Sequence, residues 1–190
     1  MREKTAALVL AAGLSRRFGA NKLLSDWRGR PLVTHAVDAA CAASVDEVVV
    51  VTGHEAEKVS ATILGQAPRP VQVVRAPDYA EGMALSLRAG IAALRSDIQA
   101  AVIFLGDMPD VPHDIAAKGL KAVLDGVPAA APVFDGRRGH PVAFHAALFP
   151  LLRALSGDEG ARSVFSDLGE AWVRIPCDDL GVLFDVDRPA

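Results

Sequence analysis

Short, almost wholly apolar runs recur along this sequence and constrain its fold more strongly than any other feature. The clearest of them occupy residues 6–11, 47–52 and 100–106. Each run is shorter than a typical helix, and each lacks the alternation of a strand that exposes one face to water. Strands of this kind are buried on both faces, as they are in a parallel sheet that helices cover on both sides. The runs therefore predict an α/β fold.

The segments between these runs show the apolar spacing of helices, most clearly over residues 32–41 and 113–124. Two later short strands, 129–133 and 142–144, flank a turn at 135–139 and predict an antiparallel hairpin. Further helices and strands are expected at residues 55–64, 71–75, 84–94, 148–155, 172–175 and 182–184. We find no linker and no internal repeat in the sequence. Residues 1–190 are therefore predicted to form a single domain, with a mostly parallel sheet and a late antiparallel hairpin.

Four loops follow the predicted parallel strands at their carboxyl ends. They contain Gly13, residues 52–53, residues 77–82 and residues 106–107. In open α/β sheets a ligand binds beyond the carboxyl ends of the strands. These four loops are therefore predicted to converge on one binding site.

The first loop, L-A-A-G-L-S-R-R-F-G-A-N-K over residues 10–22, is rich in glycine and positive charge. Its glycines let backbone N–H groups turn toward an anion, to which Arg17 and Lys22 would add full charges. The first thirty residues hold seven Lys or Arg and two Asp or Glu, although the whole chain carries a net charge of −3. The loop matches neither the P-loop nor the G-x-G-x-x-G fingerprint. It is predicted to bind phosphates; the alternative is a turn whose arginines are solvated.

A carboxylate at a strand tip faces this basic loop in the predicted fold. Asp107 follows an apolar run and Gly106, and this position suits Mg²⁺, which prefers oxygen ligands and shares them with phosphates. Asp185 and Asp187 follow the last predicted strand and share a face by alternation. Either of them could supply a second carboxylate. Alternatively, Asp107 bonds to its own turn and the two later aspartates form a solvated tail.

The composition of the chain argues against several other classes of protein. A net charge of −3 disfavours a general nucleic-acid binder. Two cysteines without a secretory signal do not indicate a disulfide framework, and no run approaches the length of a membrane span. The five histidines lack zinc-site spacing, and no Gly-x-Ser-x-Gly nucleophile motif is present. The sequence therefore predicts a cytoplasmic protein, monomeric by default, that binds a small anionic ligand.

The motif over residues 10–22 resembles the opening signature of the MobA-like nucleotidyltransferases and is most similar to the molybdenum cofactor cytidylyltransferase (MocA-like) branch. The resemblance extends nearly end to end. G-D-M-P at 106–109 resembles the family's metal-binding motif, and D-V-D at 185–187 resembles its closing acidic motif. R-G-H-P-V at 138–142 and G-D-E-G-A-R at 157–162 resemble motifs on its substrate side. The resemblance implies a Rossmann-like, three-layer, single-domain fold of the nucleotide-diphospho-sugar transferase type.

The resemblance also implies a reaction in which CMP moves from CTP to the terminal phosphate of a molybdopterin-type cofactor and pyrophosphate leaves. It implies that Lys22, Arg17 and Asp107 act in catalysis. It places Mg²⁺ (or Mn²⁺) on Asp107 together with Asp185 or Asp187. The residues implied for nucleotide binding are Leu10, Ala11, Ala12, Gly13, Ser15, Gly19, Lys22, Thr52, Gly82, Met83 and Gly106. The residues implied for the acceptor are His140, Pro141, Asp158 and Arg162.

Ala12 bears on the choice of nucleotide, because guanylyltransferase relatives resemble L-A-G-G where this chain has L-A-A-G. GTP as the donor, another phosphorylated acceptor, and a non-catalytic cofactor carrier remain alternatives. An NAD-dependent dehydrogenase is disfavoured because G-x-G-x-x-G is absent. A molybdoenzyme or its chaperone is the candidate protein partner, and no nucleic-acid or membrane partner is expected.

Overall fold

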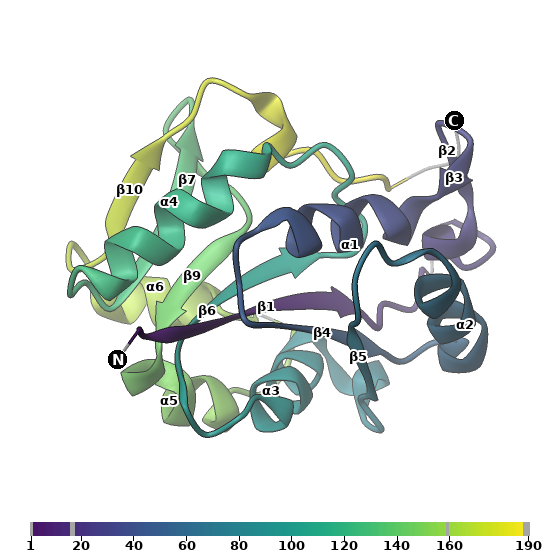
Figure 1. Ribbon diagram of the computed structural model, residues 1–190, viewed down its shortest axis with the longest axis horizontal. Helices are drawn as coiled ribbons and strands as arrows, with labels where there is room; N and C mark the ends of the chain where they lie inside the picture. The colour runs from purple at the N-terminus through teal and green to yellow at the C-terminus, as the bar shows by residue number, and fades with distance from the viewer. Residues whose placement is uncertain (1, 16–17, 159, 188–190) are drawn as a thin grey trace.

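The computed structural model describes residues 2–15, 18–158 and 160–187. At its centre is a sheet whose strands follow the order β10-β7-β9-β6-β1-β4-β5, with β8 paired to β7 (Figure 1). These strands are β1 (Lys4–Ala11), β4 (Glu47–Thr52), β5 (Gln72–Arg75), β6 (Ile98–Leu105), β7 (Ala129–Phe134), β8 (Arg137–Arg138), β9 (Val142–His145) and β10 (Val173–Pro176). The strands β2 (Asp26–Trp27) and β3 (Arg30–Pro31) form a separate small hairpin.

The parallel half of the sheet is buried on both faces, as its apolar sequence predicts. β1 lies between β4 and β6, and both pairings are parallel. Along β1, Ala7 and Val9 pack into the core on one side of the sheet, whereas Ala6 and Leu8 pack into the core on the other side. Successive side chains of a strand point to opposite faces, so a strand with two buried faces needs apolar residues throughout. The three apolar runs are confirmed as parallel strands.

Helices cover both faces of this sheet and complete three layers (Figure 1). They are α1 (Leu32–Ala42), α2 (Ala56–Gln66), α3 (Met83–Ala93), α4 (His113–Leu124), α5 (Phe149–Ala154) and α6 (Arg162–Leu168). The core on one face takes Val37 from α1 and Leu120 from α4, and the core on the other takes Leu87 from α3 and Phe165 from α6. Across the described ranges, no helix has the length and apolar character that a membrane span requires.

The later strands depart from the parallel arrangement. β9 pairs antiparallel with β7, which confirms the predicted hairpin. β9 also pairs antiparallel with β6, so it joins the hairpin to the parallel half of the sheet. β10 then pairs parallel with β7 at the edge. Residues 137–138, expected within the hairpin turn, form the short strand β8 against β7.

The strand predicted at residues 182–184 is wrong. A 3-10 helix, Leu180–Val182, lies there instead. The carboxylate of Asp179 accepts a hydrogen bond from the N–H of Gly181 at 2.8 Å and initiates this turn. Val182 is fully buried in the core beneath α4. Its apolar character therefore reflects the packing of a turn rather than pairing in the sheet.

Candidate active site

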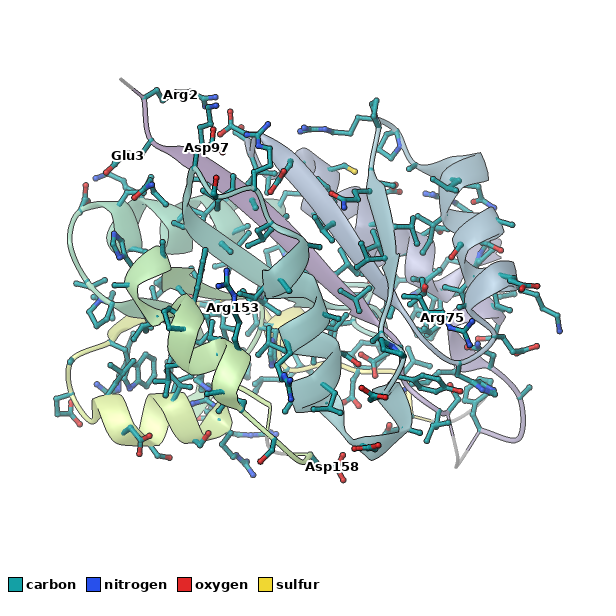
Figure 2. The ribbon with its side chains drawn as sticks, turned by 90° about the horizontal axis from the view of Figure 1, so that it is seen from below. Arg2, Glu3, Arg75, Asp97, Arg153 and Asp158 are labelled. Atoms are coloured by element: carbon teal, nitrogen blue, oxygen red, sulfur yellow. The ribbon has the colours of Figure 1, made fainter. Side chains whose placement is uncertain are left out.

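A cleft of about 490 Å³ opens at the carboxyl ends of β1 and β6. Three of the four predicted loops contribute to its wall, together with the segments that carry Asp158 and Asp187. Figure 2 shows Asp158 at the opposite end of the molecule from Asp97, which precedes β6. The lining residues are Leu10, Ala12, Gly13, Leu14, Ser15, Phe18, Lys22, Leu23, Tyr79, Ala80, Gly82, Met83, Ser86, Leu105, Asp107, Asp158 and Asp187.

The loop after β1 is held in shape by its own polar side chains. The hydroxyl of Ser15 accepts a hydrogen bond from the N–H of Lys22 at 3.1 Å and ties the two ends of the loop together. Asn21 is buried; its Oδ1 accepts from the N–H of Leu23, and its Nδ2 donates to the carbonyl of His54. The Ser15 hydroxyl keeps its own proton for donation to a ligand in the cleft.

Lys22 places its ammonium group between two carboxylates from distant parts of the chain. Its Nζ lies 2.7 Å from Oδ2 of Asp107 and 3.5 Å from Oδ1 of Asp187. The N–H of Val186 donates to the carbonyl of Asp107 at 3.0 Å, which holds the C-terminal segment beside the end of β6. Burial alone would lower the pKa of Lys22, but Asp107 and Asp187 outweigh it and raise the pKa. Lys22 is therefore a charged group at neutral pH.

The two aspartates of the last motif differ in position. Asp187 lines the cleft, whereas Asp185 does not. Burial raises the pKa of Asp185, and the negative charges of Asp187 and Asp107 raise it further, despite the opposing charge of Lys22. Negative charge is thus concentrated where the C-terminal segment meets the end of β6.

The oxygen ligands at this point fit a hard divalent cation that shares its coordination with phosphates. Mg²⁺ is typically held by one or two carboxylates, with phosphate oxygens and waters completing its shell. Asp107 and Asp187 offer two carboxylates at the wall of the cleft. Within the part of the chain that the structure describes, no group of three or more His, Cys, Asp or Glu side chains is arranged to hold a metal. The two carboxylates therefore fit a cation that shares its coordination with phosphates.

Two glycines allow close packing at the wall of the cleft and just behind it. Gly82 has a φ of 137°, and a Cβ there would lie 2.3 Å from the carbonyl oxygen of Gly157. A Cβ on Gly53 would lie 2.5 Å from the ring of Tyr79 and 2.8 Å from the Cβ of Ala12. Gly53 does not line the cleft itself, yet its lack of a side chain lets Tyr79 and Ala12 approach each other there.

The structure brings most of the predicted site residues to the cleft. Those in its wall are Leu10, Ala12, Gly13, Ser15, Lys22, Gly82, Met83, Asp107, Asp158 and Asp187. Sequence reasoning missed the apolar residues Leu14, Phe18, Leu23 and Leu105, which also line it. The signal for two of these was present, since Leu14 and Phe18 interrupt an otherwise polar loop. Arg17 lies outside the described residues.

Four residues predicted to bind the nucleotide do not line the cleft. They are Ala11, Gly19, Thr52 and Gly106. The hydroxyl of Thr52 is turned into the sheet and donates to the carbonyl of Val74 at 3.3 Å. Gly106 donates its N–H to the carbonyl of Leu10, and a Cβ at this position would lie 3.1 Å from that oxygen. Thr52 and Gly106 therefore stabilise the strand ends that carry the loops.

Of the four residues predicted for the acceptor, one lines the cleft and three do not. Asp158 is in the wall, whereas His140, Pro141 and Arg162 are not. Burial lowers the pKa of His140 to about 4, an effect that a hydrogen bond with the backbone of Ile103 partly opposes. The imidazole is therefore neutral at neutral pH.

The positive charge of Arg138 acts on His140. The guanidinium of Arg138 lies 4.2 Å from the centre of the Phe165 ring, a cation–π contact. Burial lowers the pKa of Arg138, and the charge of Arg162 lowers it further. The positive charges of Arg138 and Arg162 therefore repel each other.

The family model that describes the MobA-like NTP transferase domain matches residues 7–172. A nicotine blue oxidoreductase from Paenarthrobacter nicotinovorans is 32% identical, over 95% of this chain and 90% of that protein. A probable molybdenum cofactor guanylyltransferase from Bacillus cereus is 29% identical, over 71% of this chain and 64% of that protein. The crystal structure of Rv0371c from Mycobacterium tuberculosis superposes with a TM-score of 0.84 at 28% identity, covering 97% of this chain and 93% of that one. These likenesses confirm the nucleotide-diphospho-sugar transferase type of fold.

Proposed function

The chain belongs to the family of MobA-like NTP transferase domains, and from this membership we propose that it transfers CMP from CTP to the terminal phosphate of a molybdopterin-type cofactor. Pyrophosphate is the second product. One observation carries this proposal: Lys22 lies between Asp107 and Asp187 at the wall of a cleft bordered by the Gly-rich loop. This arrangement sets a phosphate-binding cation beside carboxylates that suit a divalent metal.

In the proposed reaction, an oxygen of the acceptor phosphate bonds to the α-phosphorus of CTP while the bond from that phosphorus to the β-phosphate oxygen breaks. The acceptor is already anionic, so catalysis rests on positioning and on neutralising charge rather than on proton removal. Lys22, Arg17 and the N–H groups of the loop hold the triphosphate and stabilise the departing pyrophosphate. Asp107 and Asp187 would hold Mg²⁺, whose charge would neutralise negative charge on the phosphates.

The choice of CTP rests on Ala12. Its side chain is nearly buried and lines the cleft close to Tyr79. The guanylyltransferase branch that this chain resembles has the motif L-A-G-G where this chain has L-A-A-G, so glycine stands there in place of Ala12. A methyl group on this wall takes up room that a purine base would need, so it favours the smaller cytosine.

The choice of acceptor rests on one named relative and on the residues predicted for the acceptor. The Bacillus cereus relative is named for a molybdenum cofactor substrate. Asp158 is in the wall, and the positive charges of Arg162 and Arg138, which act on each other, suit a phosphorylated acceptor. We propose that His140 and Pro141 complete this side as neutral contacts.

The identity shared with a protein named as an oxidoreductase favours a second candidate function, an oxidation–reduction reaction. Nicotinamide cofactors, which carry hydride in many such reactions, are bound at sites with a glycine-rich fingerprint. The sequence lacks the G-x-G-x-x-G fingerprint of such sites. Hydride transfer also leaves the carboxylates of Asp107 and Asp187 without a role. Nucleotidyl transfer therefore accounts for more of the cleft.

The proposal is tested by incubating the purified protein with Mg²⁺, molybdenum cofactor and each of the four nucleoside triphosphates, while pyrophosphate release is measured. We expect release with CTP alone, and a shift toward GTP in Ala12→Gly. Release by the wild type with GTP instead would retain nucleotidyl transfer and reject the argument from Ala12. NADH oxidation without pyrophosphate release would support the second candidate.

A further inference from the structure

The hairpin of β2 and β3 lies close to the cleft without lining it. Arg28 and Gly29 form its tip with φ values of 54° and 83°, the left-handed pair typical of a two-residue hairpin turn. Its base is attached to α1, because Nε2 of His35 lies 2.9 Å from the carbonyl oxygen of Trp27. The hairpin is therefore a fixed projection rather than a loose loop.

Two side chains of this hairpin contact two different segments of the chain. The ring of Trp27 lies 5.7 Å from the ring of Phe184, the residue before Asp185. The guanidinium of Arg28 lies 5.4 Å from the Trp27 ring. It also donates two hydrogen bonds to the carboxylate of Asp110, at 2.8 and 3.1 Å. A continuous series of contacts thus runs from Phe184 through Trp27 and Arg28 to Asp110.

The two ends of this series belong to the segments that carry the carboxylates of the cleft. Phe184 precedes Asp187 by three residues, and Asp110 follows Asp107 by three residues. At the cleft, the hydrogen bond from Val186 to Asp107 joins the same two segments. The hairpin joins them a second time, from outside the cleft. Together, the hydrogen bond and the hairpin constrain the distance between the carboxylates of Asp107 and Asp187.

We propose that Trp27 and Arg28 are positioning residues for the divalent cation, because they fix Asp187 relative to Asp107. This inference rests on the proposed function, in which those two aspartates hold the metal. Residues behind metal ligands commonly control affinity in this way, since a cation tolerates little displacement of its ligands. The Trp27 contact carries more of the effect, because Arg28 is well exposed and its ion pair is screened by water.

The test measures Mn²⁺ binding to the full chain in the presence of CTP, by loss of the free Mn²⁺ signal in electron paramagnetic resonance. We expect Trp27→Ala to raise the Kd for Mn²⁺ roughly 10-fold and Arg28→Gln to raise it by a smaller factor. Trp27→Phe should restore most of the affinity. Its ring can still pack on Phe184, and the indole N–H that it removes is buried and has no hydrogen-bond partner within the described residues.

Arg30→Gln is the matched control, because Arg30 stands in the same hairpin but pairs with Asp38 on α1. It should leave the Kd for Mn²⁺ unchanged. If the wild type itself fails to bind Mn²⁺ with CTP, the proposed metal site is wrong. If the wild type binds and Trp27→Ala and Arg28→Gln bind equally well, or if Arg30→Gln weakens binding as much as they do, the positioning role is overturned. If Trp27→Ala fails to fold, the Kd for Mn²⁺ of Arg28→Gln is compared with that of Arg30→Gln. Equal values would overturn the positioning role.

Discussion

Among the described residues of the cleft wall, Lys22 and Asp107 make the shortest ion pair, at 2.7 Å. This contact compensates the charges of a lysine and an aspartate that are both largely shielded from water. Under the proposed function, each of them has a second partner: phosphates for Lys22 and a divalent cation for Asp107. Under this proposal, binding of the nucleotide and the cation replaces the contact between Lys22 and Asp107 by contacts with the phosphates and the metal.

Replacing Asp107 tests the metal assignment at the level of one residue. Asp107→Asn keeps the shape of the side chain and removes its charge, so we expect turnover to fall by roughly 100-fold or more. Steady-state pyrophosphate release measures this. Asp97→Asn is the control, since Asp97 pairs with Lys4 at the far end of the sheet (Figure 2). Undiminished Mg²⁺-dependent turnover in Asp107→Asn would remove Asp107 from the site.

Replacing Lys22 tests the phosphate-binding role of the loop. Lys22→Met keeps an unbranched side chain but removes the charge that the triphosphate and the leaving pyrophosphate both need. We expect a higher KM for CTP and a kcat lower by on the order of 100-fold. The exposed Lys118→Met on α4 serves as the control. Unchanged values of both constants in Lys22→Met would place the phosphates elsewhere.

His140 leads to a prediction about stability and pH. Burial lowers its pKa from an ordinary 6.5 to about 4 in the folded protein. Below pH 6.5 the unfolded chain takes up a proton that the folded protein accepts only near pH 4, so the free energy of unfolding falls through this window and levels off beneath it. The contribution is on the order of 3 kcal/mol. Denaturant titrations across this range should show it in the wild type.

The matched variants separate His140 from other titrating groups. His140→Gln should flatten this part of the pH profile, whereas His113→Gln, at an exposed position at the start of α4, should leave it unchanged. A profile for His140→Gln as steep as that of the wild type would contradict the assignment. The stability profile is independent of catalysis, so it can be measured without any substrate.

At the scale of elements, the start of α3 and the loop before α6 meet at Gly82. Gly82→Ala would force a Cβ to within 2.3 Å of the Gly157 carbonyl oxygen, at a φ of 137° that alanine rarely adopts. We expect a loss of about 1–3 kcal/mol in unfolding free energy. We also expect a raised KM for the acceptor, because Asp158 must move. Gly65→Ala, in α2 with open space around it, should instead stabilise the protein by about 0.5–1 kcal/mol. Equal stabilities for the two variants would contradict this account.

The elements that the sequence predicted well are those whose environment is uniform along their length. β1, β4 and β6 are buried on both faces, so local composition is enough to identify them. The segment at residues 182–184 was predicted wrongly because an apolar residue is buried there by a turn. Local pattern cannot distinguish these two ways of burying Val182, since the difference lies in which distant residues surround it.

At the scale of the whole molecule, topology determines where the site lies. It does not determine which residues line the site. Parallel strands end at one edge, so the loops at Gly13, 77–82 and 106–107 meet there as predicted. The assignment of Asp187 rather than Asp185 to the cleft depends on a hydrogen bond between Val186 and a residue far away in the sequence. Long-range contacts of this kind leave no local signal.

The central claim is that this cleft transfers a nucleotidyl group. In the most direct measurement, CTP labelled with ³²P at the α-phosphate is incubated with Mg²⁺, molybdenum cofactor and the purified protein. The position of the label is then followed. We predict that the label moves to the cofactor, with one pyrophosphate released for each label transferred, and that chelation of the metal stops the transfer. Label that stays in CTP, or that appears as free CMP while the cofactor remains unlabelled, would contradict the claim.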